Sequence, residues 1–208
     1  MSHSAADIRA HIEKYLGPID SVLEGAACDE ARIDILHVAP AETRPVHTLC
    51  TSGMSHRAMP VPPGVETPAH IELMVTLPGD WKVHDAGEEW SWPLRQLAWL
   101  ARLPQVSGTW LGWGRTIANG EPPMPLAPNT KLCGAIIVPS LLVPTAFYEL
   151  QSAGRRIAFF SVVPLYKEEL ELEEREGMEA LLSRLVDKNI NDVIDPRRKN
   201  VGRRFGLF

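Results

Sequence analysis

The chain contains no run of apolar residues long enough to cross a membrane as a helix. Its longest run, residues 133–147, is interrupted by Pro139 and Pro144 and is shorter than the roughly 18 residues that such a helix requires. Residues 1–17 carry charged side chains where a secretion signal needs an apolar centre. These absences exclude a membrane partner for this sequence and predict a cytoplasmic protein.

The sequence also has fewer positively charged than negatively charged side chains. The sequence has 21 Lys and Arg against 26 Asp and Glu, which gives a formal net charge of −5. Proteins that hold nucleic acid neutralise its phosphates with an excess of Lys and Arg on one surface. We therefore expect no nucleic-acid partner.

Cysteine is scarce and unpaired in sequence. The three cysteines, Cys28, Cys50 and Cys133, form no CxxC pair of the kind that binds zinc or cycles between redox states, and their odd number suits a reducing compartment. Among the seven histidines, the spacing most similar to a ligand pair is that of His47 and Cys50. An odd offset along a strand directs two side chains to opposite faces. We therefore predict no metal site and no cofactor.

Short catalytic motifs are also absent. There is no HExxH and no GxSxG, and Gly112-Trp-Gly114 is followed by neither a third glycine nor the Gly-Lys-Ser/Thr of a phosphate-binding loop. Cys133 lies in an apolar run, which would raise its thiol pKa and leave it inert. We predict no catalytic residue. An enzyme of unrecognised type would instead need a pocket in which His47, His70 or His84 converges with a carboxylate.

What is present is a pattern of strands and helices in irregular order. Alternating or continuous apolar residues predict strands at 31–38, 46–52, 70–77, 133–138, 146–150 and 157–163. Apolar residues at helical spacing predict helices at 4–16, from 93 to before Pro104, and at 178–186. Because strands and helices do not alternate regularly, we predict one α+β domain over residues 1–208. Its sheet should be mostly antiparallel or mixed, with about six strands flanked by helices.

The segment 108–129 is the candidate binding region. It is rich in Gly, Pro and Trp and has no clear period, and long loops of that kind are more often functional than not. Trp110 and Trp113 flank glycines and Arg115 lies beside them, a combination enriched at interface hot spots. The same aromatic side chains could instead cover the core beneath the loop. Trp110, Trp113 and Arg115 are our candidate partner-binding residues.

The C-terminal part carries charge of both signs. Residues 168–176 hold six glutamates, which could receive a basic partner such as a toxin nuclease, although such a run is more often the solvated face of a helix. A basic segment follows in Arg197, Arg198, Lys199, Arg203 and Arg204. It could contact nucleic acid or fold back on the acidic run, and its opposite sign favours the second.

Several short motifs, in this order, resemble those of the suppressor of fused family. They are HIELMVTLP at residues 70–78, Trp92-Pro93 followed by Leu97-Ala98, residues 132–140 ending in Val-Pro-Ser, FSVVPLYKEEL at residues 160–170 followed by Gly177 and Leu181-Leu182, and DVIDP at residues 192–196. The resemblance rests on their order and spacing between residues 70 and 196.

The resemblance implies a compact α+β domain that binds other proteins and has no established catalytic centre. Animal members of the family carry a second, C-terminal domain and hold a peptide of Gli transcription factors between the two halves. Stand-alone versions are typical of bacteria, where some are proposed to be immunity proteins. We therefore expect a bacterial-type, stand-alone domain that binds a protein partner at an apolar surface near residues 110–115 or at an open sheet edge. The alternatives are an immunity protein that neutralises a cognate toxin, and an enzyme of unrecognised type.

Overall fold

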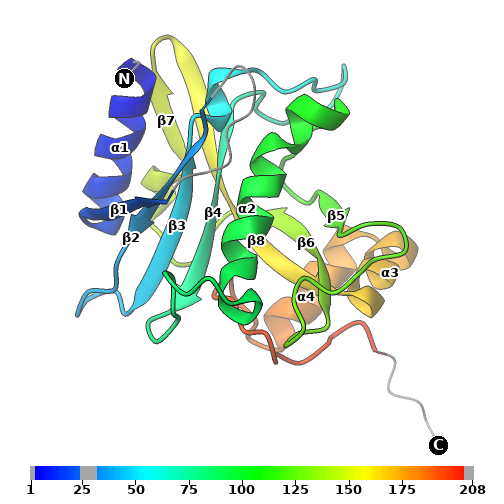
Figure 1. The fold of residues 1–208 in the computed structure, drawn as a ribbon. Coiled ribbons are helices and arrows are strands. Elements are labelled where there is room, and N and C mark those ends of the chain that lie inside the picture. Colours follow the sequence, from blue (N-terminus) through cyan, green and yellow to red (C-terminus); the bar gives the residue numbers. More distant parts are fainter. Residues whose placement is uncertain (1–2, 24–31, 204–208) are drawn as a thin grey trace, which may run out of the picture.

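The computed structural model describes residues 3–23 and 32–203, and Figure 1 shows their arrangement. The predicted α+β fold is confirmed, because the described strands form one sheet with helices on both faces. The strands are β1 (Ile19–Leu23), β2 (Asp34–Val38), β3 (Val46–Ser52), β4 (Ile71–Pro78), β5 (Thr116–Ala118), β6 (Leu132–Val138), β7 (Glu149–Ser152) and β8 (Arg155–Tyr166). The α-helices are α1 (His3–Leu16), α2 (Glu88–Ser107), α3 (Lys167–Glu176) and α4 (Met178–Asp187). Cys28, Ala31 and Arg204 lie outside the described residues.

The sheet is mixed and has more strands than the sequence predicts. Its order is β1-β2-β3-β4-β8-β6-β5, and β7 pairs with the first part of β8. Strands β4 and β8 run parallel, whereas the other pairs in this order are antiparallel. In the described ranges the sheet thus has eight strands rather than about six. The open edges of that path belong to β1 and β5.

The two edge strands were missed because little in their sequence marks them. β1 has five residues that alternate only between half-buried and exposed, and β5 has three residues inside the segment expected to be a loop. The predicted strand at 146–150 is shifted as well. Thr145–Phe147 form a turn of 3-10 helix that buries Phe147 completely, and β7 begins only at Glu149.

Helix α2 is longer than predicted at both ends, because it contains Pro93 and Pro104 rather than starting and stopping near them. A proline inside a helix removes the N–H that would bond to the carbonyl four residues earlier. For Pro93 that carbonyl is Glu89, and the side-chain amide of Asn129 donates to it at 3.2 Å. The Asn129 side chain therefore replaces the hydrogen bond that Pro93 cannot donate. In the described part of the chain no helix is both long and apolar enough to span a membrane.

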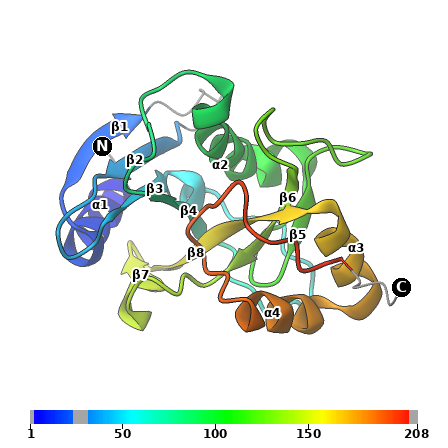
Figure 2. The same ribbon diagram turned by 90° about the horizontal axis from the view of Figure 1, so that it is seen from below.

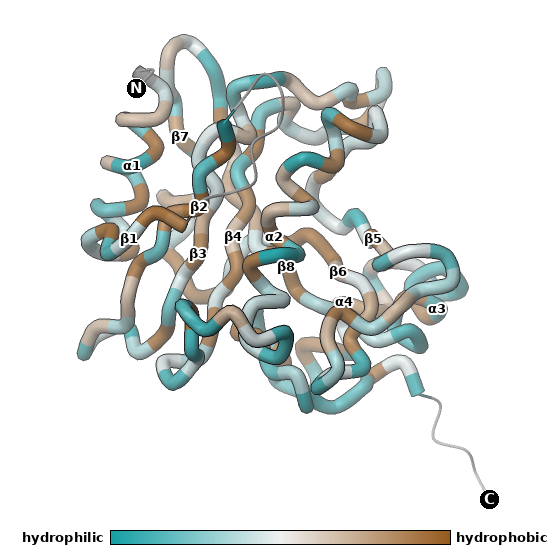
Figure 3. The backbone as a smooth tube through the Cα atoms, viewed as in Figure 1, coloured by the Kyte–Doolittle hydropathy of each residue, from teal (hydrophilic) through white to brown (hydrophobic). Residues whose placement is uncertain are grey.

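The buried apolar side chains form three groups, each enclosed between the sheet and the helices that cover it. α2 packs on one face of the sheet, while α1 and, at the other end, α3 with α4 cover the opposite face (Figure 2). Successive residues of a strand point to opposite faces, so Leu49 joins the core under α2 and Cys50 the core under α1. Figure 3 shows the apolar residues gathered along the strands. Most of β8 is buried on both faces, in agreement with the buried strand predicted at 157–163.

His11 in α1 should make the protein less stable in mild acid. Its ring stacks against both Phe147 and Phe159, which also contact each other, and its Nε2 lies 2.9 Å from the carbonyl oxygen of Phe147. Burial lowers the pKa of His11 below its usual 6.5. The unfolded chain therefore binds this proton more readily, so the free energy of unfolding should fall as the pH drops below about 6.5.

Chemical unfolding of the protein and of His11→Phe at pH 7.5 and pH 5.5 checks this prediction. The phenylalanine retains the stacking but does not titrate. The variant should lose less stability between the two pH values than the original protein does, and an equal loss would contradict the assignment to His11.

Candidate functional site

The structure brings two of the three candidate residues, Trp110 and Arg115, together and leaves Trp113 apart from them. The guanidinium carbon of Arg115 lies 5.1 Å from the ring centroid of Trp110, and Trp110 is half-buried against the core under α2. Trp110 therefore covers the core, in agreement with the alternative interpretation. Trp113 is 56% exposed and lies at an apolar groove that neither Trp110 nor Arg115 lines.

We call this feature the α4 groove, because it lies between α4 and the strands β6 and β8. Its volume is about 230 Å³, and its floor includes the buried side chains of Ile136 and Leu185. At its rim Trp113, Leu141 and Val186 are exposed by 56%, 69% and 65%. The lining residues are Trp113, Ile136, Val138, Pro139, Leu141, Val163, Leu182, Leu185, Val186, Ile190, Asn191 and Asp192. Three large apolar side chains thus remain in solvent around one hollow.

Gly114 positions Trp113 at the α4 groove. Its φ of 77° lies in the left-handed region, and a Cβ atom there would lie 1.8 Å from Sδ of Met178 in α4. A side chain at this residue would therefore strain the backbone and displace the side chain of Met178 from its contact with the loop. The backbone N–H of Gly114 donates to Ile137 at 2.7 Å, which ties the segment to β6.

Asp192 fixes the opposite rim. Its side chain is buried and accepts hydrogen bonds from the hydroxyl of Ser140 at 2.6 Å and from the backbone N–H of Leu141 at 3.1 Å. The hydroxyl of Tyr148 donates to the carbonyl of Ser140 at 2.7 Å. Both rims are therefore held in place, which lowers the entropy lost when a partner binds. The sequence interpretation missed Leu141 and Val186, because exposed apolar residues are not marked as such by any motif.

The acidic run is not simply a solvated helix face, so this expectation was wrong for part of the run. It forms most of α3, but Glu169 is fully buried and its carboxylate lies 2.5 Å from the guanidinium of Arg198. Glu168 pairs with Arg203 at 3.2 Å. The described basic residues Arg198 and Arg203 thus fold back on the acidic run, and that prediction is confirmed.

Cys133 has the environment that the sequence predicts for an inert thiol, and Cys50 is buried as well. Burial raises the pKa of Cys133 and raises that of Cys50 well above the usual value. Cys50 packs in the core under α1, whereas the ring of His47 contacts the ring of His37. His47 and Cys50 therefore lie on opposite faces of β3, as their spacing predicts.

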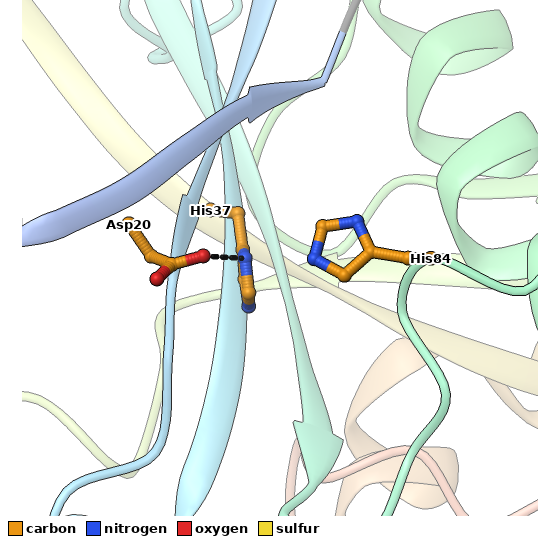
Figure 4. A group of neighbouring side chains, drawn as sticks. All are labelled: Asp20, His37 and His84. Atoms are coloured by element: carbon orange, nitrogen blue, oxygen red, sulfur yellow. Dashed lines mark ion pairs between the residues drawn. The ribbon is translucent and has the colours of Figure 1, made fainter.

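A group of histidines lies at the other end of the sheet, near the edge strand β1. Asp20 and His84 approach His37 from opposite sides (Figure 4), and His47 bonds to His37 from the neighbouring strand. Burial lowers the pKa of both His37 and His47. His84 is exposed and the Asp20 side chain is 51% exposed, so the group is open to solvent and is not a water-excluding cleft. Two of the three histidines considered at the outset thus lie near a carboxylate, whereas His70 bonds to the carbonyl of Ser55.

Comparison with known proteins shows the family. The family model described as suppressor of fused protein matches residues 29–199. The chain belongs to the suppressor of fused family. No curated protein matches the chain by sequence.

Solved structures of suppressor of fused proteins share this fold. A homolog from Neisseria gonorrhoeae has 14% identity and a TM-score of 0.71, and the match covers 95% of this chain and 96% of that one. The crystal structure of a Sufu–Fu complex matches with 15% identity and a TM-score of 0.67, over 95% of this chain and 92% of that one. Suppressor of fused from Drosophila matches with 14% identity and a TM-score of 0.67. That match covers 96% of this chain but only 51% of the Drosophila chain.

Proposed function

We propose that this suppressor of fused domain is a non-enzymatic, cytoplasmic protein-interaction module that receives an apolar segment of a partner polypeptide in the α4 groove. The observation that carries the proposal is the exposure of Trp113, Leu141 and Val186 around that hollow. Contiguous apolar surface of this kind on a soluble domain marks an interaction site. A structural relative was crystallised as a complex of Sufu with Fu, which supports protein binding as the general function.

The shape and chemistry of the α4 groove favour a polypeptide over a metabolite. At about 230 Å³ it is smaller than the pockets of roughly 300–1,000 Å³ that usually enclose small molecules. The carboxylate of Asp192 already accepts two hydrogen bonds within the chain, and most other lining side chains are apolar. The expected occupant is therefore an amphipathic segment that inserts one or two large apolar side chains, as helices do in grooves of other domains.

Trp113→Ala should weaken partner binding about 30-fold, because a buried tryptophan at an interface contributes about 2 kcal/mol. Val186→Lys should weaken it as strongly by placing a charge at the rim. A photoreactive residue in place of Leu141 captures the partner from native lysate, and Kd values are then measured with the purified partner. Matched controls are Trp99→Ala and Val106→Lys, which alter residues of α2 that are 40% and 74% exposed.

Both control variants should bind like the original protein. A partner that binds the Trp113 and Val186 variants with unchanged Kd would exclude the α4 groove as its site.

An immunity protein is the case in which the partner is a toxin. The acidic run at residues 168–176 gives little electrostatic support to the immunity-protein hypothesis, because Glu168 and Glu169 pair with arginines of the same chain. Glu176 pairs with Arg184 in the same way, at 2.7 Å. Less charge is therefore left for a basic toxin than the sequence suggests. The groove variants test a toxin partner in the same way as any other.

A further inference from the structure

The group around His37 has the composition of a metal site. One donor atom each from Asp20, His37 and His84 lies within 4.8 Å of the other two. They come from three separate parts of the chain, namely β1, β2 and the loop between β4 and α2. Imidazole nitrogens and a carboxylate oxygen are ligands that zinc and similar divalent ions accept.

The distances agree with such a site. The Nδ1 of His37 lies 3.3 Å from Oδ2 of Asp20. Two donor atoms that each bind zinc at about 2.1 Å in tetrahedral geometry are themselves about 3.4 Å apart. The ligand atoms of His37 and Asp20 are therefore already spaced as a zinc ion requires. His84 lies on an exposed loop with a ring nitrogen within 4.8 Å of the other two donor atoms. A small movement of this side chain would bring it to the position of a third ligand.

The hydrogen bond between His37 and His47 involves the ring nitrogen of His37 that is not beside Asp20. The Nε2 of His37 lies 2.9 Å from the Nδ1 of His47. When His37 donates this bond, its Nδ1 carries a lone pair that can bind a cation.

That lone pair lies beside a carboxylate. The hydroxyl of Ser21, at 3.1 Å, can donate to Nδ1, but it leaves the negative charge of Asp20 beside the nitrogen. A cation between Asp20 and His37 removes this repulsion. A hydrogen bond that runs outward from a ligating histidine, here from His37 to His47, is typical of metal sites, because it fixes the tautomer and orients the ring.

We propose that Asp20, His37 and His84 bind a divalent ion of the zinc type, with His47 as the outer partner that orients His37. Three protein ligands leave a fourth position for water. The ion would fasten the edge strand β1 to the loop that precedes α2, and so connect a sheet edge to the helix that covers the sheet. Its role is therefore a clamp on the fold, which is separate from the α4 groove.

The test is calorimetric titration of Zn²⁺ into the full chain, purified without a histidine tag and stripped with a chelator. We expect one ion per chain. Asp20→Asn and His84→Ala should each raise the Kd at least 10-fold, because even outer partners of metal ligands contribute 10-fold to 100-fold. Both residues are exposed, so these variants should fold, which circular dichroism checks. Asp80→Asn is the matched control, an exposed carboxylate in the same loop as His84.

A second readout is thermal. Zn²⁺ should raise the Tm of the original protein and of Asp80→Asn, and at the same concentration should raise the Tm of Asp20→Asn and His84→Ala by clearly less. No saturable binding, or a Kd that either ligand variant leaves unchanged, would overturn the proposal.

Discussion

Replacing Glu169 with alanine should lower the free energy of unfolding by about 3–5 kcal/mol, because it leaves a buried guanidinium without its counter-charge. The side chain of Glu169 is fully buried and that of Arg198 is 7% exposed. Each carboxylate oxygen of Glu169 accepts one bond from Arg198, at 2.6 Å and 2.5 Å. The backbone N–H groups of Tyr166 and Val201 donate to the same carboxylate, both at 2.9 Å.

This ion pair holds the C-terminal segment against the start of α3. Arg198 also donates to the carbonyl of Pro164 at 2.7 Å, so the segment is bonded to β8 as well. Gly202 allows the close approach, since a Cβ there would lie 2.2 Å from the carbonyl group of Glu168. Loss of Glu169 should therefore release the last described residues along with the helix start.

Urea unfolding of Glu169→Ala, Arg198→Ala and the double variant measures the effect. The double variant should be destabilised by clearly less than the sum of the two single changes, because it leaves no unpaired buried charge. The control is Arg203→Ala, whose side chain is 64% exposed and pairs with Glu168 at the surface. It should cost at most about 1 kcal/mol. A single change at Glu169 that costs no more than this control would contradict the prediction.

The sequence predicted the elements whose burial follows a regular period. Five of the six predicted strands and the helix at 4–16 are present, because their apolar side chains repeat at the spacing of a strand or a helix. The edge strands β1 and β5 have little apolar surface to bury, so no such signal marks them. α2 contains two prolines, and at Pro93 the lost bond is compensated by a distant residue, because Asn129 donates to the carbonyl of Glu89. Such contacts cannot be deduced from local sequence.

The candidate site was only partly predictable for a related reason. Trp113 was identified from its glycine neighbours, whereas Leu141 and Val186 become neighbours of it only through the packing of α4 on β6 and β8. His37 and His47 lie in strands that were correctly predicted and that pair with each other, but His84 comes from a loop whose course no pattern shows. A site assembled from loops therefore requires the fold before its members can be recognised.

The motifs that carry the family resemblance contain buried carboxylates that hold backbone in place. Glu72 lies in the motif at 70–78, Glu169 in that at 160–170 and Asp192 in that at 192–196. Each accepts at least one hydrogen bond from a backbone N–H of another segment. These motifs therefore specify the scaffold, while the α4 groove is formed largely by apolar residues. This is why the sequence indicates the family and leaves the partner open.

Glu72→Ala should cost at least about 3 kcal/mol, because it leaves several buried donors without an acceptor. Glu72 is fully buried in β4, and one of its oxygens accepts bonds from the N–H groups of Gly53 and Ser55, both at 3.0 Å. The hydroxyls of Ser55 and Thr51 donate to the carboxylate at 2.6 Å and 2.5 Å. Gly53 has a φ of 122°, so the carboxylate stabilises a turn that only glycine adopts readily.

Glu72→Gln separates the loss of an acceptor from the loss of volume. The amide oxygen can still accept from Gly53 and Ser55, whereas the amide nitrogen cannot accept from Thr51. This variant should therefore cost about half as much as alanine in urea unfolding. Glu149→Ala removes a carboxylate that is 49% exposed and pairs with Arg156, and it should cost at most about 1 kcal/mol. If glutamine proved as damaging as alanine, the negative charge rather than the set of acceptor bonds would be what this turn requires.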